Sequence, residues 1–306
     1  EAGADAVKFQ THIAAEESTL DEPFRVRFSK QDETRYAYWK RMEFSEGQWR
    51  ELAEYVKTKG LVFLSSPFSV KAVDMLESIG VSAWKVGSGE VNSAALFEAM
   101  IKTQKPILVS TGMSNWNEIT NISERLQQLN TEYLLFQCTT KYPTPMEQVG
   151  LNILEEMRVK YNCAVGLSDH SGSKYPTMAA IARGIDAIEV HVVFDKKMFG
   201  PDVSSSLTIT ELSDVCSFRD TIELMGRSPV NKDELAKELS PLKENFSKSV
   251  CLTECFPEGH CIRLEDLTCK KPGTGIPEGQ MHLLVGKVLA RDVSSDRLLK
   301  QEDLNA

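Results

Sequence analysis

Charged, hydroxyl and imidazole side chains stand two positions apart in several short segments of this chain. The pairs are Lys8 with Gln10, Thr140 with Tyr142, Ser168 with His170, and Glu189 with His191. Residues two apart in a β-strand point to the same side of the sheet, so each pair presents two polar groups to one surface. If these surfaces line one pocket, that pocket contains amines, hydroxyls, carboxylates and imidazoles.

Two of the lysines, Lys8 and Lys85, lie inside apolar segments. A buried ammonium group needs a nearby anion, which is either a carboxylate such as that of Glu90 or a bound ligand. Backbone N–H groups at residues 87–89 and three hydroxyls at strand ends favour a phosphate or carboxylate ligand; the hydroxyls belong to Ser66, Ser88 and Ser168. An alternative is a Schiff-base aldolase with a desolvated lysine as nucleophile, which leaves the histidines without a purpose.

His170 and His191 lie at the ends of neighbouring predicted strands. Two neutral imidazoles that lie close together make half of a catalytic metal site and leave positions for substrate and water. The alternative is that each is a hydrogen-bonded structural residue. Carboxylates nearby in the pattern favour the metal: Asp169, Glu189, Glu90 and Asp202. The remaining histidines, His12, His260 and His282, are predicted to be loop or surface residues without a role.

A scaffold that gathers several strand ends is needed to position these groups. Seven short runs are apolar at nearly every position, as expected of parallel strands covered on both sides. They are Ala4–Gln10, Leu61–Phe68, Ala83–Gly89, Pro106–Gly112, Tyr133–Cys138, Ala164–Asp169 and Ala187–Phe194. Between them, Ser45 and Gln48 predict a capping box, and Ser69 and Ser114 are predicted N-caps.

Repeated βα units predict an α/β fold, a (β/α)8 TIM barrel with its active site at the carboxyl ends of the strands. Because such a barrel has eight strands, we expect the first strand to lie upstream of Glu1. Helices are expected at Thr210–Met225 and Asp233–Leu239, and short strands and turns follow from Ser249. The predicted domains are therefore a barrel at 1–230, a linker at 231–248 and a small β-rich domain at 249–306.

Composition limits the partners. The chain has 306 residues and a net charge of −9, which argues against nucleic acid or an anionic membrane as the main partner. No apolar run approaches the roughly 20 residues that cross a bilayer. The seven cysteines are best interpreted as reduced thiols of a cytoplasmic protein. A zinc site at the last four, Cys251, Cys255, Cys261 and Cys269, is a weaker alternative because their spacing matches no ligand pattern.

Eight motifs in order resemble the N-acetylneuraminate (sialic acid) synthase family. They are GADAVKFQT (3–11), FLSSPF (63–68), WKVGSGE (84–90), STGMS (110–114), CTTKYPTP (138–145), GLSDHSG (166–172), IEVHVVFDKKMFGPDVSSSLT (188–208) and KKPGTGIP (270–277). The resemblance covers the whole chain, and the C-terminal part looks like the antifreeze-like (SAF) domain of that family. It implies a metal-dependent condensation of phosphoenolpyruvate with an N-acylated hexose to a nine-carbon, sialic-type acid.

The resemblance also implies a role for each residue. His170 and His191 would bind a divalent metal, usually Mn²⁺ or Mg²⁺. Phosphoenolpyruvate would be held by Lys8, Ser66, Lys85, Ser88, Thr140 and Ser168. Gln10, Tyr142 and Asp202 would contact the acceptor sugar, and Lys271 would contact its N-acyl group from the other subunit of a domain-swapped homodimer. The expected catalytic residues are Glu90, Asp202 and Lys85.

The implied reaction joins C3 of phosphoenolpyruvate to the open-chain aldehyde, whose oxygen the metal polarises. Water then adds at C2, and phosphate leaves with C–O cleavage. Three departures from the family pattern stand out: its opening strand is absent, Thr140 replaces an Asn, and Lys271 replaces an Arg. A KDO-type synthase that uses a phosphorylated aldose, and an inactive homologue that only binds sugars or partners, are the alternatives.

Overall fold

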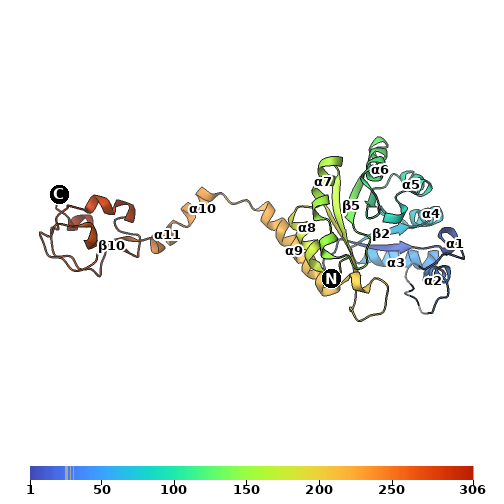
Figure 1. Ribbon diagram of the computed structural model, residues 1–306, viewed down its shortest axis with the longest axis horizontal. Coiled ribbons are helices and arrows are strands. Elements are labelled where there is room, and N and C mark those ends of the chain that lie inside the picture. Colours follow the sequence, from blue (N-terminus) through green and yellow to red (C-terminus); the bar gives the residue numbers. More distant parts are fainter. Residues whose placement is uncertain (25–26, 28, 30, 306) are drawn as a thin grey trace. The chain divides into compact units, whose positions relative to one another are not determined.

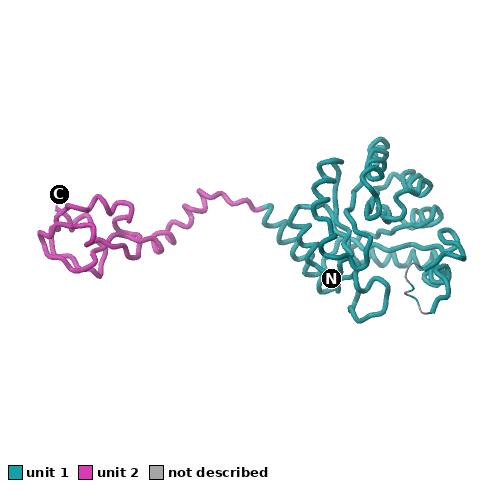
Figure 2. Tube along the Cα trace, viewed as in Figure 1, with its two compact units in different colours: residues 1–227 teal, residues 228–306 magenta. Residues whose placement is uncertain are grey.

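The computed structural model describes residues 1–24, 27, 29 and 31–305. The chain forms two compact units, Glu1–Arg227 and Ser228–Ala306 (Figure 2). Each unit has its own apolar core, so each is considered by itself. The predicted domain boundaries and the linker at 231–248 stay predictions.

Eight parallel strands form a curled half-barrel sheet in the first unit (Figure 1). The strands are β1 Ala6–Thr11, β2 Val62–Pro67, β3 Trp84–Val86, β4 Ile107–Ser110, β5 Tyr133–Cys138, β6 Ala164–Asp169, β7 Ala187–Val193 and β8 Ser206–Thr208. They pair in sequence order from β1 to β8. The TIM-type α/β class is thereby confirmed, and the seven predicted runs supply β1 to β7. The short strand β8 was not predicted.

Helices follow most strands, and in Figure 1 they surround the sheet. They are α1 Ala14–Glu17, α2 Arg35–Met42, α3 Glu46–Thr58, α4 Val70–Ile79, α5 Ala94–Ile101, α6 Trp116–Gln128, α7 Leu151–Tyr161, α8 Lys174–Ala182 and α9 Ile209–Arg227. Three single turns of 3-10 helix lie in the loops: η1 Ser88–Glu90, η2 Met146–Gln148 and η3 Val203–Ser205. The α9 bounds agree with the helix expected at Thr210–Met225.

Helix starts largely follow the predicted caps. Ser45 caps α3 with the predicted capping box, in which its hydroxyl accepts from the N–H of Gln48 at 3.3 Å. Ser69 caps α4 as predicted. The cap of α6 is Asn115 and not the predicted Ser114. Asn115 accepts two backbone N–H groups with its side-chain oxygen, and Glu118 completes a capping box that Ser114 could not form one residue earlier.

The core of the first unit lies between the outer face of the sheet and the helices. Alternate strand residues such as Phe63, Trp84 and Leu135 pack there, fully buried. The other half of each strand's residues faces the inside of the curled sheet. Because the helices take the apolar side chains, the polar residues at the same strand ends are left to line the inner face.

The two edges of this sheet are joined by side chains. In the described part of the chain no ladder pairs β1 with β8. Arg219 on α9 instead forms an ion pair with Asp5 just before β1 at 2.6 Å, and donates to the carbonyl oxygen of Gly3 at 3.2 Å. Gly3 has φ +91°, and a Cβ added to it would lie 3.1 Å from Cβ of Cys216, also on α9. We call these four residues the α9 clasp.

The second unit is a small β- and turn-rich domain. It contains α10 Lys232–Glu238, α11 Ser240–Phe246, antiparallel β9 Ser249–Leu252 and β10 Leu267–Lys270, and the 3-10 helices η4 Leu264–Asp266, η5 Glu278–Leu284 and η6 Gln301–Asp303. Val250, Leu252, Leu289 and Leu299 are fully buried at its centre. All seven cysteines lie in the described part of the chain, and none of them forms a disulfide.

A buried carboxylate organises the end of this unit. Asp303 is 1% exposed and accepts hydrogen bonds from Arg297 at 2.7 and 3.0 Å and from the N–H of Lys300 at 2.9 Å. Hydrogen bonding to Arg297 outweighs burial and lowers the pKa of the Asp303 carboxyl. Its stabilisation is therefore present above the ordinary carboxyl pKa and disappears as the pH falls through the lowered value.

Replacing Asp303 with Asn should lower the stability of the second unit. Arg297 loses its charged partner, and we expect the unfolding free energy of this unit to fall by about 1–3 kcal/mol. The four tryptophans, at positions 39, 49, 84 and 116, all lie in the first unit. Urea unfolding followed by tryptophan fluorescence should therefore be unchanged, while amide hydrogen exchange in residues 249–305 accelerates. Equal changes in both units would contradict independent units.

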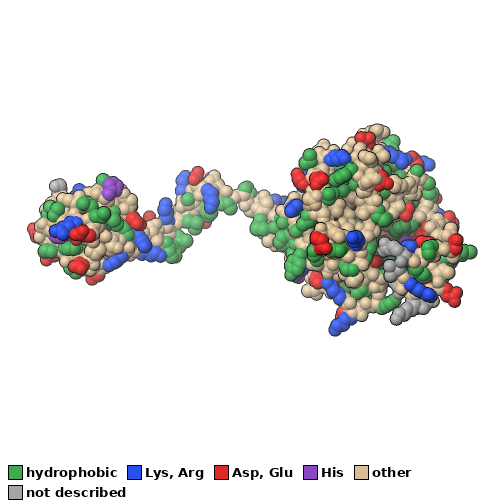
Figure 3. All heavy atoms as spheres, in the orientation of Figure 1, with side chains coloured by type: hydrophobic (Ala, Val, Ile, Leu, Met, Phe, Trp, Pro, Cys, Tyr) green, Lys and Arg blue, Asp and Glu red, His purple; other side chains and the backbone are tan. Residues whose placement is uncertain are grey.

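No helix in the described ranges is both long and apolar enough to cross a membrane. On the face of the first unit seen in Figure 3, acidic and basic side chains are interspersed.

Candidate active site

Predicted site residues from five strands meet on the inner face of the curled sheet, towards its carboxyl end. The register places Gln10 of β1 opposite Ser66 of β2. It also places Cys138, Ser168 and Glu189 side by side across β5, β6 and β7. Parallel strands that end at one edge thus gather side chains that are far apart in the sequence, as in other barrels of this type.

Lys8 and Lys85 share one carboxylate, that of Glu189. The Nζ atom of Lys8 lies 2.8 Å from Oε1, and that of Lys85 lies 3.0 Å from Oε2. Lys85 is 3% exposed, also donates to Ser110, and lies 5.2 Å from the ring centroid of Phe136. The lysines were expected to need an anion, and Glu189 is that anion, not Glu90.

Burial and charge act in opposite directions on this group. Burial opposes ionisation of Glu189, but the charges of Lys85 and Lys8 outweigh it and hold the pKa of the carboxyl well below its usual range. Burial, helped by the charge of Lys8, lowers the pKa of Lys85. With all three groups ionised, two ammoniums and one carboxylate leave one positive charge at the centre of the site. The site therefore attracts an anion even though the whole chain is acidic.

The two predicted metal ligands lie together beside this charge. The ring centroids of His170 and His191 are 5.2 Å apart, and Tyr142 lies 4.5 Å from the first and 6.0 Å from the second. His170 Nε2 is 3.3 Å from the hydroxyl of Tyr142, and its Nδ1 is 3.7 Å from Sγ of Cys138. His170 is 5% exposed, so its ring is held in place on several sides.

Both imidazoles are kept neutral. Burial, followed by the charge of His191, lowers the pKa of His170 to about 4. Burial also lowers the pKa of His191, although the charge of Asp202 opposes this. Neutral imidazole is the form that binds metal, so the pair fits a divalent cation as two of its ligands. Within the described residues no group of three or more His, Cys, Asp or Glu could hold a metal ion. The other ligands would therefore have to be substrate oxygens and water.

A small cradle lies next to the histidines. Ser88 accepts from the N–H of Gly112 at 3.1 Å, and Thr140 Oγ1 is buried without a hydrogen-bond partner among the described residues. A Cβ placed on Gly112 would lie 2.4 Å from Thr140 Oγ1, 2.8 Å from Cys138 Sγ and 2.9 Å from Ser88 Oγ. Glycine is thus required for the space, and the unpartnered hydroxyl matches an absent acceptor such as a phosphate oxygen.

Of the remaining predicted residues, five lie in the first unit and one lies in the second. Ser66 and Ser168 are buried on β2 and β6, and Gln10 is exposed on β1. Glu90 is half-buried at the end of η1, where burial and the charge of Glu17 raise the pKa of its carboxyl. Asp202 is half-buried just before η3. Burial lowers the pKa of His191 and raises that of Tyr38, and the negative charge of Asp202 raises the pKa of both. Lys271 belongs to the second unit, where its Nζ lies 4.8 Å from the ring centroid of Phe246.

Several residues of the site were missed from the sequence. Glu189 was predicted to share a face with His191, but not to be the carboxylate that pairs with both Lys8 and Lys85. Ser110 and Cys138 are the last residues of β4 and β5, and neither carries a charge that would have marked it in the sequence. His12 lies in the loop that follows β1, as one of the two predicted alternatives has it, but only 11% of its side chain is exposed.

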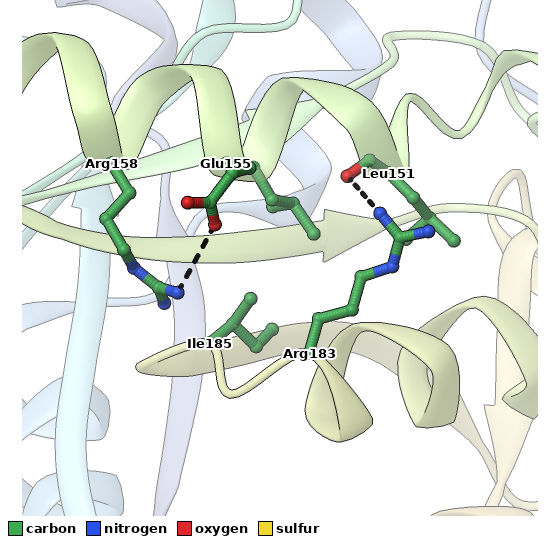
Figure 4. Close-up of a pocket in the computed structure, with 6 residues that line it drawn as sticks. Leu151, Glu155, Arg158, Arg183 and Ile185 are labelled. Atoms are coloured by element: carbon green, nitrogen blue, oxygen red, sulfur yellow. Dashed lines mark hydrogen bonds and ion pairs between the residues drawn. The ribbon is translucent and has the colours of Figure 1, made fainter.

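A surface pocket of about 250 Å³ lies elsewhere, between α7 and the segment that follows α8 (Figure 4). Its two arginines are engaged: Arg158 lies 3.8 Å from Glu155 and 3.5 Å from Asp186, and Arg183 donates to the carbonyl oxygen of Leu151 at 3.1 Å. The pocket brings together no nucleophile, imidazole or unpartnered buried polar group. The chemistry is therefore assigned to the inner face of the sheet.

Comparison with known proteins agrees with the resemblance. Residues 1–229 match the NeuB family, and residues 256–305 match the SAF domain. The chain is 30% identical to human N-acetylneuraminate-9-phosphate synthase, over 99% of this chain and 85% of the human one. It is 29% identical to N,N′-diacetyllegionaminic acid synthase of Campylobacter jejuni, over 98% and 91% of the two chains.

A solved structure shares the fold. The crystal structure of N-acetylneuraminic acid synthetase from Leptospira borgpetersenii superimposes with a TM-score of 0.67 at 24% identity, over 80% of this chain and 82% of that one. The chain therefore belongs to the NeuB family and is, like its named relatives, a transferase-type synthase, with a SAF domain near its C-terminus.

Proposed function

We propose that this protein condenses phosphoenolpyruvate with an N-acylated hexose to a nonulosonic acid, in a reaction that requires a divalent metal. The acceptor is N-acetylmannosamine or a 2,4-diacetamido-6-deoxyhexose. Relatives named as synthases of sialic, legionaminic and pseudaminic acids support the product class. The observation that carries the proposal is the adjacency of a positively charged lysine pair, bridged by Glu189, to a pair of neutral imidazoles.

Phosphoenolpyruvate would occupy the region between the lysines and the cradle. The excess positive charge of the Lys8–Glu189–Lys85 group suits its phosphate and carboxylate groups. Thr140 offers a hydroxyl without a partner in the described structure, and Ser66, Ser88 and Ser168 lie at the same strand ends. Such donors are fixed by the strands before the substrate arrives, which strengthens their effect on developing charge.

The histidine pair and Glu90 would act on the aldehyde of the acceptor sugar. A divalent cation held by His170 and His191 supplies Lewis-acid polarisation of a carbonyl oxygen when it is bound. Burial and the charge of Glu17 raise the pKa of Glu90, which favours its protonated form, and a proton held there would be available to a developing alkoxide. Gln10, Tyr142 and Asp202 would orient the acceptor's hydroxyl groups. The contact of Lys271 with the acyl group and the domain-swapped homodimer stay predictions of the resemblance.

Lys85 raises the question of Schiff-base chemistry, since its pKa is lowered by burial. Its Nζ atom, however, lies 3.0 Å from Glu189 Oε2 and donates a hydrogen bond to Ser110 Oγ. The amine is therefore held as an ion-pair partner. Borohydride trapping in the presence of pyruvate, whose ketone could form an imine, should leave the protein unmodified. Covalent labelling of Lys85 would replace our proposal with the aldolase.

The direct test is phosphate release from phosphoenolpyruvate. It should require both an acceptor sugar and Mn²⁺ or Mg²⁺, and it should stop on addition of EDTA. N-acetylmannosamine and its 2,4-diacetamido-6-deoxy analogue should be compared, together with a phosphorylated aldose as the KDO-type alternative. Release with the phosphorylated aldose alone would favour that alternative. A folded protein that binds sugar but releases no phosphate under any condition would favour the binding-only homologue.

A further inference from the structure

His12 directly follows β1, the strand that carries Lys8 and Gln10. Lys8 and Gln10 face the inside of the sheet, while Phe9 packs outward against Trp49 and Phe63. His12 is two residues beyond Gln10, immediately after β1 ends at Thr11. It therefore lies at the carboxyl end of the sheet, where the site residues gather.

The ring of His12 is held between two aromatic side chains. Trp39 of α2 stacks on it with ring centroids 4.0 Å apart and an interplanar angle of 19°. Phe68, directly after β2, stacks on it at 4.4 Å and 10°. Its Nδ1 lies 2.6 Å from Oε1 of Glu17, the last residue of α1. In Figure 1, α1 and α2 lie together beyond the end of β1.

The second ring nitrogen of His12 has no hydrogen-bond partner among the residues that the structure describes. Nε2 is buried and has no hydrogen bond to any residue that the structure describes. Because a carboxylate only accepts, Nδ1 donates to Glu17, and a neutral ring then presents a lone pair at Nε2. Leaving a buried polar atom unpaired is unfavourable, so such an atom in an otherwise ordered cluster points to an absent partner. That partner must be a donor, such as a hydroxyl or an amide N–H.

The surroundings of His12 connect it to the predicted acceptor region. A Cβ on Gly87, next to Ser88 of the cradle, would lie 3.7 Å from Phe68, which stacks on His12. In addition to burial, the charge of Glu17 raises the pKa of Glu90, and the charge of Asp202 raises the pKa of Tyr38, the residue before Trp39. The His12 cluster thus lies near Glu90, which is expected to act beside the aldehyde, and near Asp202, which is expected to contact the sugar.

We propose that His12 is a further acceptor-binding residue, whose Nε2 accepts a hydrogen bond from a hydroxyl or acylamino N–H of the hexose. The inference rests on the proposed function, because it names the acceptor as the missing donor. Glu17 fixes the tautomer, and the two aromatic rings fix the plane. The surrounding side chains adjust around the acceptor on binding, as interface rotamers commonly do.

Three variants of His12 separate these roles. His12→Phe keeps the stacking and removes both nitrogens. His12→Gln can place an amide near the position of Nε2, and His12→Asn near that of Nδ1. His282→Phe is the matched control, since His282 is an exposed histidine of the second unit. Steady-state kinetics with each substrate varied, thermal unfolding, and calorimetric titration with N-acetylmannosamine should be measured for all four.

Loss of one hydrogen bond to the acceptor corresponds to about a tenfold change. We expect His12→Phe and His12→Asn to raise the acceptor KM and the sugar Kd about tenfold, with the phosphoenolpyruvate KM within about twofold of wild type. His12→Gln should recover much of this loss. If His12→Phe fails to fold, the Gln and Asn variants decide by their difference.

Two outcomes would overturn the inference. In the first, the wild type is active and the His12 variants have the same acceptor KM as the wild type. In the second, the variants change the phosphoenolpyruvate KM or the melting temperature alone. If wild type binds the sugar but releases no phosphate, the proposed function fails, and the Kd values still test His12. If wild type does not bind the sugar at all, both proposals fail.

Discussion

Replacing His170 with alanine should lower metal-dependent phosphate release by at least about a hundredfold, and His191→Ala should do the same. Loss of an outer-shell partner already reduces metal affinity or activity by about 10–100-fold, and loss of a ligand should do more. The variants should also retain less Mn²⁺ after desalting, measured by elemental analysis. His282→Ala, in the second unit, removes an exposed histidine and should behave as wild type.

Thermal unfolding of the alanine variants must be measured alongside, because His170 is buried and its loss opens a cavity. A stable, correctly folded variant without turnover supports the metal role. If the double variant, stripped of metal, still releases phosphate at the wild-type rate, the histidines have another purpose and the proposed chemistry is wrong.

Glu189→Gln should destabilise the first unit by about 3 kcal/mol. Removing one partner of a buried ion pair leaves an uncompensated charge, which usually lowers the unfolding free energy by about 3–5 kcal/mol. Here Lys85 stays buried, while Lys8, with 20% of its side chain exposed, can turn towards water. Urea unfolding followed by tryptophan fluorescence reports on this unit, because all four tryptophans lie in it.

A surface glutamate provides the matched control for this change. Glu155 on α7 is 69% exposed and lies 3.8 Å from Arg158, so Glu155→Gln should change stability by less than about 0.5 kcal/mol. Adding Lys85→Met to Glu189→Gln removes both buried charges, and the double variant should lose much less than the sum of the single ones. Strict additivity would show that Lys85 and Glu189 do not interact.

Local sequence patterns predicted much of the site. The two-residue spacing placed Lys8 with Gln10 and Ser168 with His170 on one face, and the structure puts these residues on the inner side of the sheet. The apolar runs predicted β1 to β7 because parallel strands covered on both sides have little room for polar residues. The capping box at Ser45 marked the start of α3 for the same local reason.

Long-range contacts and very short elements could not be predicted in this way. Glu189 and Lys8 are 181 positions apart in the sequence. No periodicity in the sequence indicates which of many carboxylates pairs with a given lysine. Strand β8 has three residues and is defined by its pairing with His191 to Val193. His12 is a loop residue whose burial could not be predicted, because it comes from Trp39 and Phe68, which are distant along the chain.

The α9 clasp has a consequence for the order of folding. Arg219 meets Asp5 across 214 positions of sequence, whereas neighbouring strands meet across a few tens. Contacts between distant segments form slowly because a long loop must close first. The clasp should therefore form late, after the strands have assembled from neighbour to neighbour. In stopped-flow experiments, Arg219→Ala should leave the folding rate nearly unchanged and accelerate unfolding. The clasp therefore acts mainly by slowing the unfolding of the first unit.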